Sequence, residues 1–302
     1  MMIFQKFFVF LVVFVVATSV SCRRGGSEYV TVALSESFSG FDTLTSDKSD
    51  AAAERVRNLM FNALVKKTES FDYTGEMAET IETSEDGKTI TFKLRQNIKF
   101  HNGAAFTSKD VKYTFDELFK STGYKRLAFF DSVDKKLVPH IDGIETPDEF
   151  TVVFRIARPA LKNQLLSNLV AIPVIPDGTV ATQRSQPVGS GPFKFVNLDQ
   201  SQSTVELEAF AEYWDGAPTV KKIRVKTIPD ASALQAELQT GAVDIAPVPS
   251  NLTPDSLKTL ASQPNLNVQQ FDGSNIQYLG LNTQSAPLTN VKIRQAIGYA
   301  ID

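Results

Sequence analysis

The sequence predicts a mixed α/β fold, because two kinds of apolar pattern follow one another along most of the chain. Apolar residues alternate with polar ones in short stretches such as Tyr29 to Leu34, which indicates strands. Apolar residues recur every three or four positions in stretches such as 50–64, which indicates amphipathic helices. A content of 42% hydrophobic and 22% charged residues is ordinary for a packed globular protein.

The first 22 residues have the pattern of an export signal. Lys6 precedes an uncharged apolar run from Phe7 to Ala17, which is shorter than the roughly 20 residues a membrane-spanning helix needs. We therefore expect residues 1–21 to be a signal peptide and the mature chain to begin at Cys22, the only cysteine, which has no partner for an internal disulfide. Residues 22–28 are expected to form a flexible tether.

The first half of the mature chain predicts strands and helices in turn. The strand from Tyr29 is followed by a Ser/Gly-rich turn and by a helix that Asp50 caps, with an apolar face expected to include Ala63 and Leu64. A turn at 85–88 leads into a strand through Ile90, Phe92 and Leu94, and Thr107 with Asp110 has the spacing of a capping box. A strand at 150–156 and a short helix at 160–169 follow, before prolines at 173 and 176 interrupt regular structure.

The second half begins with three predicted strands, around 193–195, 205–207 and 223–227. Asp230 caps a helix that Gly241 is expected to end in a left-handed conformation, and another helix starts at Thr253-Pro254. Further strands are expected at 243–248, 266–271 and 276–281. Glycines 189 and 191 are expected to permit a positive φ in a turn.

Four blocks of sequence resemble family 5 of the extracellular solute-binding proteins of ABC importers, the oligopeptide-, dipeptide- and nickel-binding type. They are, in order, IETSEDGKTITFKLRQNIKFHNGAAFTSKDVKYTFDEL at 81–118, VGSGPFK at 188–194 with EYWDG at 212–216, ALQAELQTGAVDI at 233–245, and YLGLNTQSAPLTNVKIRQAIGYAID at 278–302. Together the blocks span nearly all of the mature chain.

The resemblance implies a periplasmic binding protein-like fold of type II, in which two lobes close on a ligand. It assigns residues 29–60 and 188–271 to the first lobe, 61–187 to an inserted subdomain, and 272–302 to the hinge strand and the start of the second lobe. The second lobe is then largely missing, so the chain is expected to be truncated and to bind ligand weakly or not at all.

The resemblance implies a receptor that binds its ligand and catalyses no reaction. A receptor anchored by lipid at Cys22 would take a peptide or similar small solute outside the cytoplasmic membrane and deliver it to an ABC permease and its ATPase. The receptor is expected to be a periplasmic or otherwise extracytoplasmic monomer without a cofactor. The segment Ser19 to Cys22 resembles a lipoprotein cleavage site, although Ser19 stands where leucine is usual, and ordinary secretion with a free thiol is the alternative.

Ligand contact is predicted for five residues. Phe38, Gly40, Phe41 and Asp42 follow the first strand, at the end where open α/β sheets present loops to a crevice. An equally weighted alternative is that Phe38 and Phe41 cover the core. Asn282 is a candidate hinge or cleft residue. For two further residues a structural role is expected in place of ligand contact. Trp214 is expected to pack in the core or at its edge, and Arg294 to lie on an exposed helix face.

Other functional classes are less well supported by the sequence. The net charge of −3 argues against nucleic-acid binding. His101 and His140 are the only histidines and have no metal-ligand spacing, so no metal site is predicted. The segment 189–192 matches neither a hydrolase nucleophile elbow nor a phosphate loop, and no catalytic residues are predicted. A secreted hydrolase and an interaction-only surface lipoprotein remain the alternatives.

Overall fold

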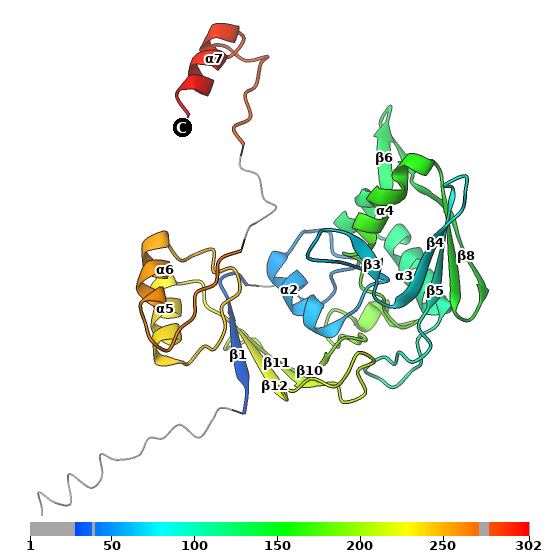
Figure 1. Cartoon of the computed structure of the whole chain (residues 1–302), viewed down its shortest axis with the longest axis horizontal. Helices are drawn as coiled ribbons and strands as arrows, with labels where there is room; N and C mark the ends of the chain where they lie inside the picture. Colours follow the sequence, from blue (N-terminus) through cyan, green and yellow to red (C-terminus); the bar gives the residue numbers. More distant parts are fainter. Residues whose placement is uncertain (1–27, 38–39, 272–277, 302) are drawn as a thin grey trace, which may run out of the picture. The chain divides into compact units, whose positions relative to one another are not determined.

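The computed structural model describes residues 28–37, 40–271 and 278–301 (Figure 1). The chain divides into two compact units, one ending at Leu266 and the other beginning at Asn267. The predicted signal peptide, Cys22 and Phe38 lie outside the described residues.

The first sheet has four strands in the order β1-β12-β11-β10. Strand β1 pairs in parallel with β12, with Val32 opposite Val225, and the remaining neighbours are antiparallel. The predicted alternation is confirmed, because the inward residues Val205, Leu207 and Val225 are buried. The bounds are Val30–Leu34, Lys222–Thr227, Thr204–Ala209 and Phe193–Asp199 in spatial order.

The second sheet is antiparallel, in the order β4-β5-β9-β8. Its buried face carries Ile90, Phe92 and Phe154, and the Phe92 and Phe154 rings meet edge to face with their centroids 5.4 Å apart. The bounds are Ala78–Thr83, Thr89–Leu94, Thr151–Ile156 and Ile141–Asp148 in spatial order. Two hairpins complete the strands: β2 (Val65–Lys67) with β3 (Tyr73–Gly75), and β6 (Phe130–Val133) with β7 (Lys136–Pro139).

The helices that follow Asp50, Thr107 and Asp230 begin at the caps that the sequence predicts. Asp50 Oδ1 accepts from Ala53 N at 2.8 Å, and Asp230 Oδ1 accepts from Ala233 N at 2.7 Å. Thr107 and Asp110 form the predicted capping box, and Gly241 ends its helix at φ +66°. The helices are α2 (Ala51–Met60), α3 (Ser108–Lys120), α4 (Lys162–Leu169), α5 (Ala231–Thr240), α6 (Pro254–Ala261) and α7 (Val291–Tyr299), with 3₁₀ turns η1 (Tyr124–Phe129), η2 (Pro159–Leu161) and η3 (Val180–Thr182).

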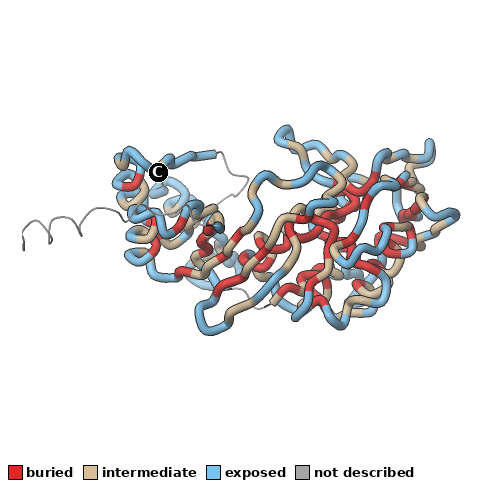
Figure 2. The backbone as a smooth tube through the Cα atoms, turned by 90° about the horizontal axis from the view of Figure 1, so that it is seen from below, coloured by how far each residue is buried: buried red, intermediate tan, exposed pale blue. Residues whose placement is uncertain are grey.

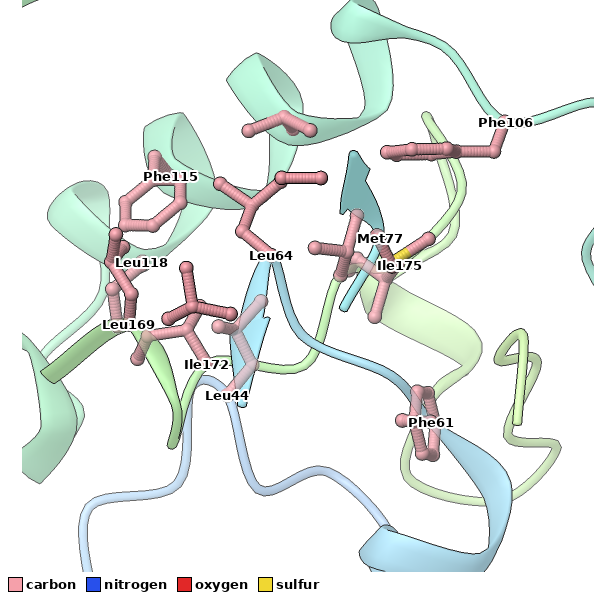
Figure 3. Close-up of a cluster of buried hydrophobic side chains, with 14 of the residues drawn as sticks. Leu44, Phe61, Leu64, Met77, Phe106, Phe115, Leu118, Leu169, Ile172 and Ile175 are labelled. Atoms are coloured by element: carbon pink, nitrogen blue, oxygen red, sulfur yellow. The ribbon is translucent and has the colours of Figure 1, made fainter. Parts of the chain in front are cut away.

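One hydrophobic cluster joins the two sheets and the helices α2, α3 and α4. The buried residues run through the interior of this unit (Figure 2). In Figure 3, Leu64 and Met77 lie among side chains from α3, from α4 and from the segment after α4. A smaller cluster includes Leu234 and Leu238 of α5 and Leu260 of α6.

Three predicted strands are wrong in the described residues. In the segment 243–248 only Ile245 makes a bridge, with Val32, and the prolines at 247 and 249 end the pairing because they have no N–H to donate. Residues 266–271 and 278–281 form no strand, and none of them pairs with a sheet edge in this part of the structure. Apolar alternation alone therefore overpredicts strands in these segments.

Two local predictions are also corrected. Helix α2 ends at Met60, so Ala63 and Leu64 are buried in an extended segment and do not extend the helix face. Gly189 and Gly191 do not have a positive φ. Both are required for another reason, because a Cβ atom on either glycine would come within 3.0 Å of the backbone of Met60.

Candidate functional site

The candidate site lies at the carboxyl end of β1, where the parallel strands β1 and β12 end together. Leu34 O accepts from Ile228 N at 2.8 Å, which holds the two strand ends side by side. The hydroxyls of Ser35 and Ser250 lie 2.9 Å apart and connect the loop after β1 to the loop that precedes α6. Loops at the carboxyl ends of parallel strands are the usual ligand-contacting position in open α/β sheets.

Asp42 fixes the fold of the loop between β1 and α2. Its Oδ1 accepts from the backbone N–H groups of Leu44 and Thr45 at 3.0 Å each, and its Oδ2 accepts from the Thr45 hydroxyl. These bonds use an aspartate side chain in place of a backbone turn. Asp42 is therefore a residue that shapes the loop, and its carboxylate is already occupied by protein donors.

The other predicted loop residues lie in different surroundings. Gly40 is partly exposed at φ +152°, and Arg184 lies against it. Phe41 is 3% exposed and packs edge to face on Phe195 at 4.9 Å, which fits the alternative that it covers the core. Gly40 and Asp42 line a shallow hollow, which Thr43, Ser46, Lys48, Asp50, Ala53, Glu54 and Tyr124 complete.

Glu54, which lines this hollow, belongs to a charged cluster with Lys125 and Arg57. Lys125 Nζ lies 2.6 Å from Glu54 Oε1 and donates to Ala171 O at 2.7 Å, and Arg57 Nε lies 2.6 Å from Glu54 Oε2. The Lys125 side chain is only 4% exposed, and this burial lowers its pKa to about 8, although the charge of Glu54 opposes the shift. Burial, followed by the Glu54 charge, raises the pKa of Tyr124 to about 12.

The hydroxyl of Thr43 is the unusual group in the hollow. Thr43 is 4% exposed, and its Oγ1 has no hydrogen-bond partner among the described residues. The Asp50 and Glu54 carboxylates beside it already accept from Ala53 N and from Arg57 and Lys125. A buried hydroxyl without a partner lowers stability, so Thr43 is a position where the fold carries an unfavourable polar group.

A second polar cluster, around Asn62, is structural. Asn62 Nδ2 donates to Glu76 Oε1 at 2.8 Å, and Asn62 Oδ1 accepts from Trp214 Nε1 at 3.2 Å. Trp214 also packs against the main core cluster, with the Arg95 guanidinium 5.0 Å above its ring. The predicted packing role of Trp214 is confirmed, and burial raises the pKa of the Glu76 carboxyl in the same cluster.

His101 is held by the 189–191 turn. Gly189 N donates to its Nδ1 at 3.3 Å, and its Nε2 lies 3.0 Å from Gly191 O. This pattern requires the neutral imidazole with its proton on Nε2. Burial lowers the pKa of His101 to about 4, although the bond to Gly191 opposes the shift.

His101 is expected to make the protein less stable in mild acid. The unfolded chain takes up a proton near pH 6.5, whereas folded His101 does so only near pH 4, so the free energy of unfolding falls as the pH falls through this window. We expect a loss of about 2 kcal/mol relative to a His101→Gln variant, since His101 is partly exposed. Urea unfolding of both proteins from pH 7 to pH 4 measures it, and a constant difference between them would contradict the assignment.

The sequence did not indicate several residues at this edge. Ile245 and Val248 are 50% and 68% exposed, and Val248 has φ +48°, which is rare for a β-branched residue. The two prolines flanking Val248 were the only signal for irregular backbone. Thr43, Glu54 and Tyr124 had no signal, because α2 and η1 meet only in the folded chain.

Asn282 and Arg294 belong to the second unit and shape its turns. Asn282 Nδ2 donates to Ser285 Oγ at 3.1 Å, and Asn282 Oδ1 accepts from Gln284 N at 3.0 Å. Arg294 donates to Leu288 O at 2.7 Å. Among the residues that the structure describes, none of the helices has the length and apolar character to cross a membrane.

Comparisons with known proteins agree with the fold. The chain is 29% identical to heme-binding protein A of Haemophilus influenzae, over 80% of this chain and 47% of that protein, and 29% identical to the dipeptide-binding protein of Escherichia coli, over 80% and 48%. The structure superposes with a TM-score of 0.75 on the dipeptide-binding protein of Pseudoalteromonas sp. SM9913 in complex with Met-Leu, at 22% identity and over 90% of this chain and 57% of that chain.

A further structural match is NikZ from Campylobacter jejuni in complex with Ni(L-His), with a TM-score of 0.73 and 22% identity over 91% of this chain and 53% of that chain. The periplasmic binding protein-like fold is thus confirmed, and the chain spans about half the length of the curated relatives it matches. The family model for bacterial extracellular solute-binding proteins, family 5 (Middle), matches residues 72–302. The chain therefore belongs to family 5 of the bacterial extracellular solute-binding proteins.

Proposed function

We propose that this chain provides the first lobe of a receptor for an ABC importer, which captures peptides or similar small solutes outside the cytoplasmic membrane and delivers them to a permease. The observation that carries the proposal is the family match over residues 72–302. The names of the relatives support the ligand class, since they describe dipeptide-binding, oligopeptide-binding and heme-binding proteins.

The geometry at the carboxyl end of β1 supports binding through backbone and hydroxyl groups. The loop places the partly exposed Gly40 at the hollow, while the Asp42 and Asp50 carboxylates accept from protein N–H groups. Polar groups of a peptide backbone can use such positions directly or through water. Of the loop residues predicted from sequence, we assign ligand contact to Gly40 and a loop-shaping role to Asp42. Phe38 and Asn282 remain proposed contacts.

The wider organisation is proposed on the same basis. Residues 29–60 and 188–271 would form the first lobe, 61–187 an inserted subdomain and 272–302 the connection to a second lobe. Cys22 would carry the lipid that anchors a monomeric receptor at the membrane surface. The partners would be the permease and its ATPase, and the receptor would change no bond in its ligand.

A binding assay that also detects turnover separates the receptor from a hydrolase. Saturation-transfer NMR with a mixture of dipeptides and pentapeptides should give signals from intact peptides, with weak affinity of about 1 mM, since one lobe offers one of the two surfaces that enclose a ligand. The same sample, followed for a day, should contain no cleavage products. Peptide fragments that appear in proportion to protein concentration would overturn the proposal.

Thr43→Val should stabilise the ligand-free protein by about 1 kcal/mol, because it replaces a buried hydroxyl without a partner by a methyl group of similar size. Urea unfolding of the variant and of the unchanged protein measures this effect.

Thr114→Val is the matched control. Thr114 is also fully buried, but its Oγ1 accepts from Ile175 N at 3.1 Å. Its removal leaves that N–H unpaired, so this variant should lose about 1 to 2 kcal/mol and bind peptide normally if folded. Equal destabilisation by the two substitutions would show that Thr43 has a partner.

A further inference from the structure

The start of η1 contacts the segment that follows β1. Tyr124 N donates to Ser46 O at 3.0 Å, so this part of the chain is joined to the 40–46 segment by a backbone hydrogen bond. The 40–46 segment includes Gly40 and Asp42, which line the hollow. The strands β2 to β5 and helix α3 lie between the two contacting segments in the sequence. A distant part of the chain therefore holds the loop after β1.

Gly123, which precedes η1, allows this contact to be close. A Cβ atom added to Gly123 would lie 2.9 Å from both C and O of Thr45 and 3.0 Å from Ser46 O, and all three are backbone atoms. The backbone of Gly123 has φ −58° and ψ 147°, a polyproline-like conformation that other residues adopt as well. Glycine is thus required here for the close approach of two backbones and not for its conformational freedom.

Two side chains attach the same part of the chain to α2, the helix that follows the loop. Tyr124 Oη donates to Glu54 Oε1 at 3.2 Å, and Lys125 Nζ lies 2.6 Å from the same oxygen. Lys125 also donates to Ala171 O at 2.7 Å, which links the contact to the segment after α4. The start of η1 therefore contacts both the loop after β1 and the helix that follows it.

The 40–46 segment has no regular secondary structure, and part of its support is local. Asp42 Oδ1 accepts from Leu44 N and Thr45 N at 3.0 Å each, and Leu44 is buried. The bonds to Asp42 fix the turn itself, whereas the burial of Leu44 and the contact with η1 fix where the turn lies. A loop that is held in place before the ligand arrives loses less conformational entropy on binding.

We propose that residues 123–125 hold the 40–46 segment in the conformation that contacts the ligand, and that Gly123 is a positioning residue for binding. This role rests on the proposed function, since ligand contact is assigned there to Gly40. It gives the proposed inserted subdomain, which contains residues 123–125, a part in ligand affinity. Gly123 itself is buried, so its effect on binding acts through the backbone that it contacts.

Gly123→Ala tests this role in the full-length chain. The added methyl group must displace the backbone of Thr45, so the amides of Leu44 and Thr45 should exchange their hydrogens about tenfold faster. The rates are measured by NMR relative to the amides of β5, which report the opening of the whole fold. Trialanine, titrated by NMR, should bind about fivefold more weakly, because the displaced segment must be ordered again on binding.

Tyr124→Phe is a second, milder variant. It removes the hydroxyl that donates to Glu54 but keeps the backbone bond to Ser46 O. The loss of one hydrogen bond to a carboxylate should loosen the contact only in part. We expect the exchange ratio to rise about threefold and trialanine to bind about twofold more weakly. This variant decides the question even if Gly123→Ala does not fold.

Two controls separate this role from a general loss of stability. Gly143→Ala adds the same methyl group at a position where a Cβ would meet no atom within 4 Å. Thr114→Val lowers the stability of the fold, and both hydrogen bonds of the Thr114 hydroxyl go to Ile175. Both control proteins should keep the exchange ratio and the trialanine affinity of the natural protein within about twofold.

Faster exchange together with weaker binding, in the two η1 variants and not in the controls, supports the proposal. Changes of equal size in variants and controls would overturn it, as would faster exchange of the 40–46 amides with unchanged trialanine affinity. Absence of trialanine binding to the natural protein would overturn the proposed function, whereas the exchange ratio decides in either case whether η1 holds the segment.

Discussion

Gly191→Ala is expected to destabilise the protein by about 4 kcal/mol or to prevent folding. A Cβ atom at this position would lie 2.5 Å from Met60 C and 2.7 Å from Phe61 N. Both are backbone atoms, which cannot move away by a side-chain rotation. The close approach is needed because Gly191 N donates to Met60 O at 2.9 Å, where α2 ends. Urea unfolding followed by circular dichroism measures the loss.

Gly143→Ala is the matched control for this substitution. Gly143 lies in β8, where an added Cβ would meet no atom within 4 Å, and its φ is not positive. Alanine there reduces the freedom of the unfolded chain, so stability should stay the same or rise by about 0.5 kcal/mol. If Gly191→Ala were tolerated as well as Gly143→Ala, the contact between the 189–191 turn and α2 would be wrong.

The parts of the fold that the sequence predicted correctly are those decided within a few residues. Asp50, Thr107 and Asp230 each accept from or pair with groups about three positions away, so the caps follow from sequence alone. The left-handed φ of Gly241 is local in the same way. Strands were predicted correctly where a segment with apolar alternation also has a neighbouring strand to pair with, as β11 and β12 do.

The errors arose where contacts distant in the sequence decide the structure. The pattern GSG suggested a positive φ, but the glycines are required by the backbone of Met60, which no local pattern reveals. The segment around Ile245 has the alternation of a strand, yet its pairing with the edge strand β1 is a single bridge and stops before the prolines at 247 and 249. For Phe41 the sequence left ligand contact and core packing equally open, and its burial against Phe195 depends on the packing of β10, which no local pattern reveals.

The sequence predicted where the candidate site lies, but not most of the residues that line it. The end of β1 follows from the fold class, and Gly40 and Asp42 do lie at the hollow. Glu54 and Tyr124 of the hollow come from α2 and from η1, which are separated in the sequence by the strands β2 to β5 and by helix α3. Only the structure therefore shows that α2 and η1 meet at Glu54.

Glu54→Ala is expected to cost about 4 kcal/mol, because it leaves Lys125 buried without its counter-charge. The carboxylate also receives Arg57 at 2.6 Å, so its removal breaks two ion pairs at once. Glu145→Ala is the control, since Glu145 lies 2.6 Å from Arg155 but both side chains are more than half exposed. That substitution should leave the free energy of unfolding nearly unchanged. Similar losses at the two sites, measured by urea unfolding at pH 7, would contradict the burial of Lys125.

The pH dependence of the same cluster gives an independent measurement. Folded Lys125 loses its proton near pH 8, whereas the unfolded chain keeps it to about 10.5, so the unfolded state holds more protons between these values. The free energy of unfolding of the natural protein should therefore rise with pH across this window, by up to about 3 kcal/mol relative to Lys125→Met, which cannot titrate. Tyr124 opposes the rise only above pH 10, because its pKa lies near 12 when folded. A difference between the two proteins that does not change from pH 7 to pH 10 would mean that Lys125 stays charged, and that Glu54 compensates fully for its burial.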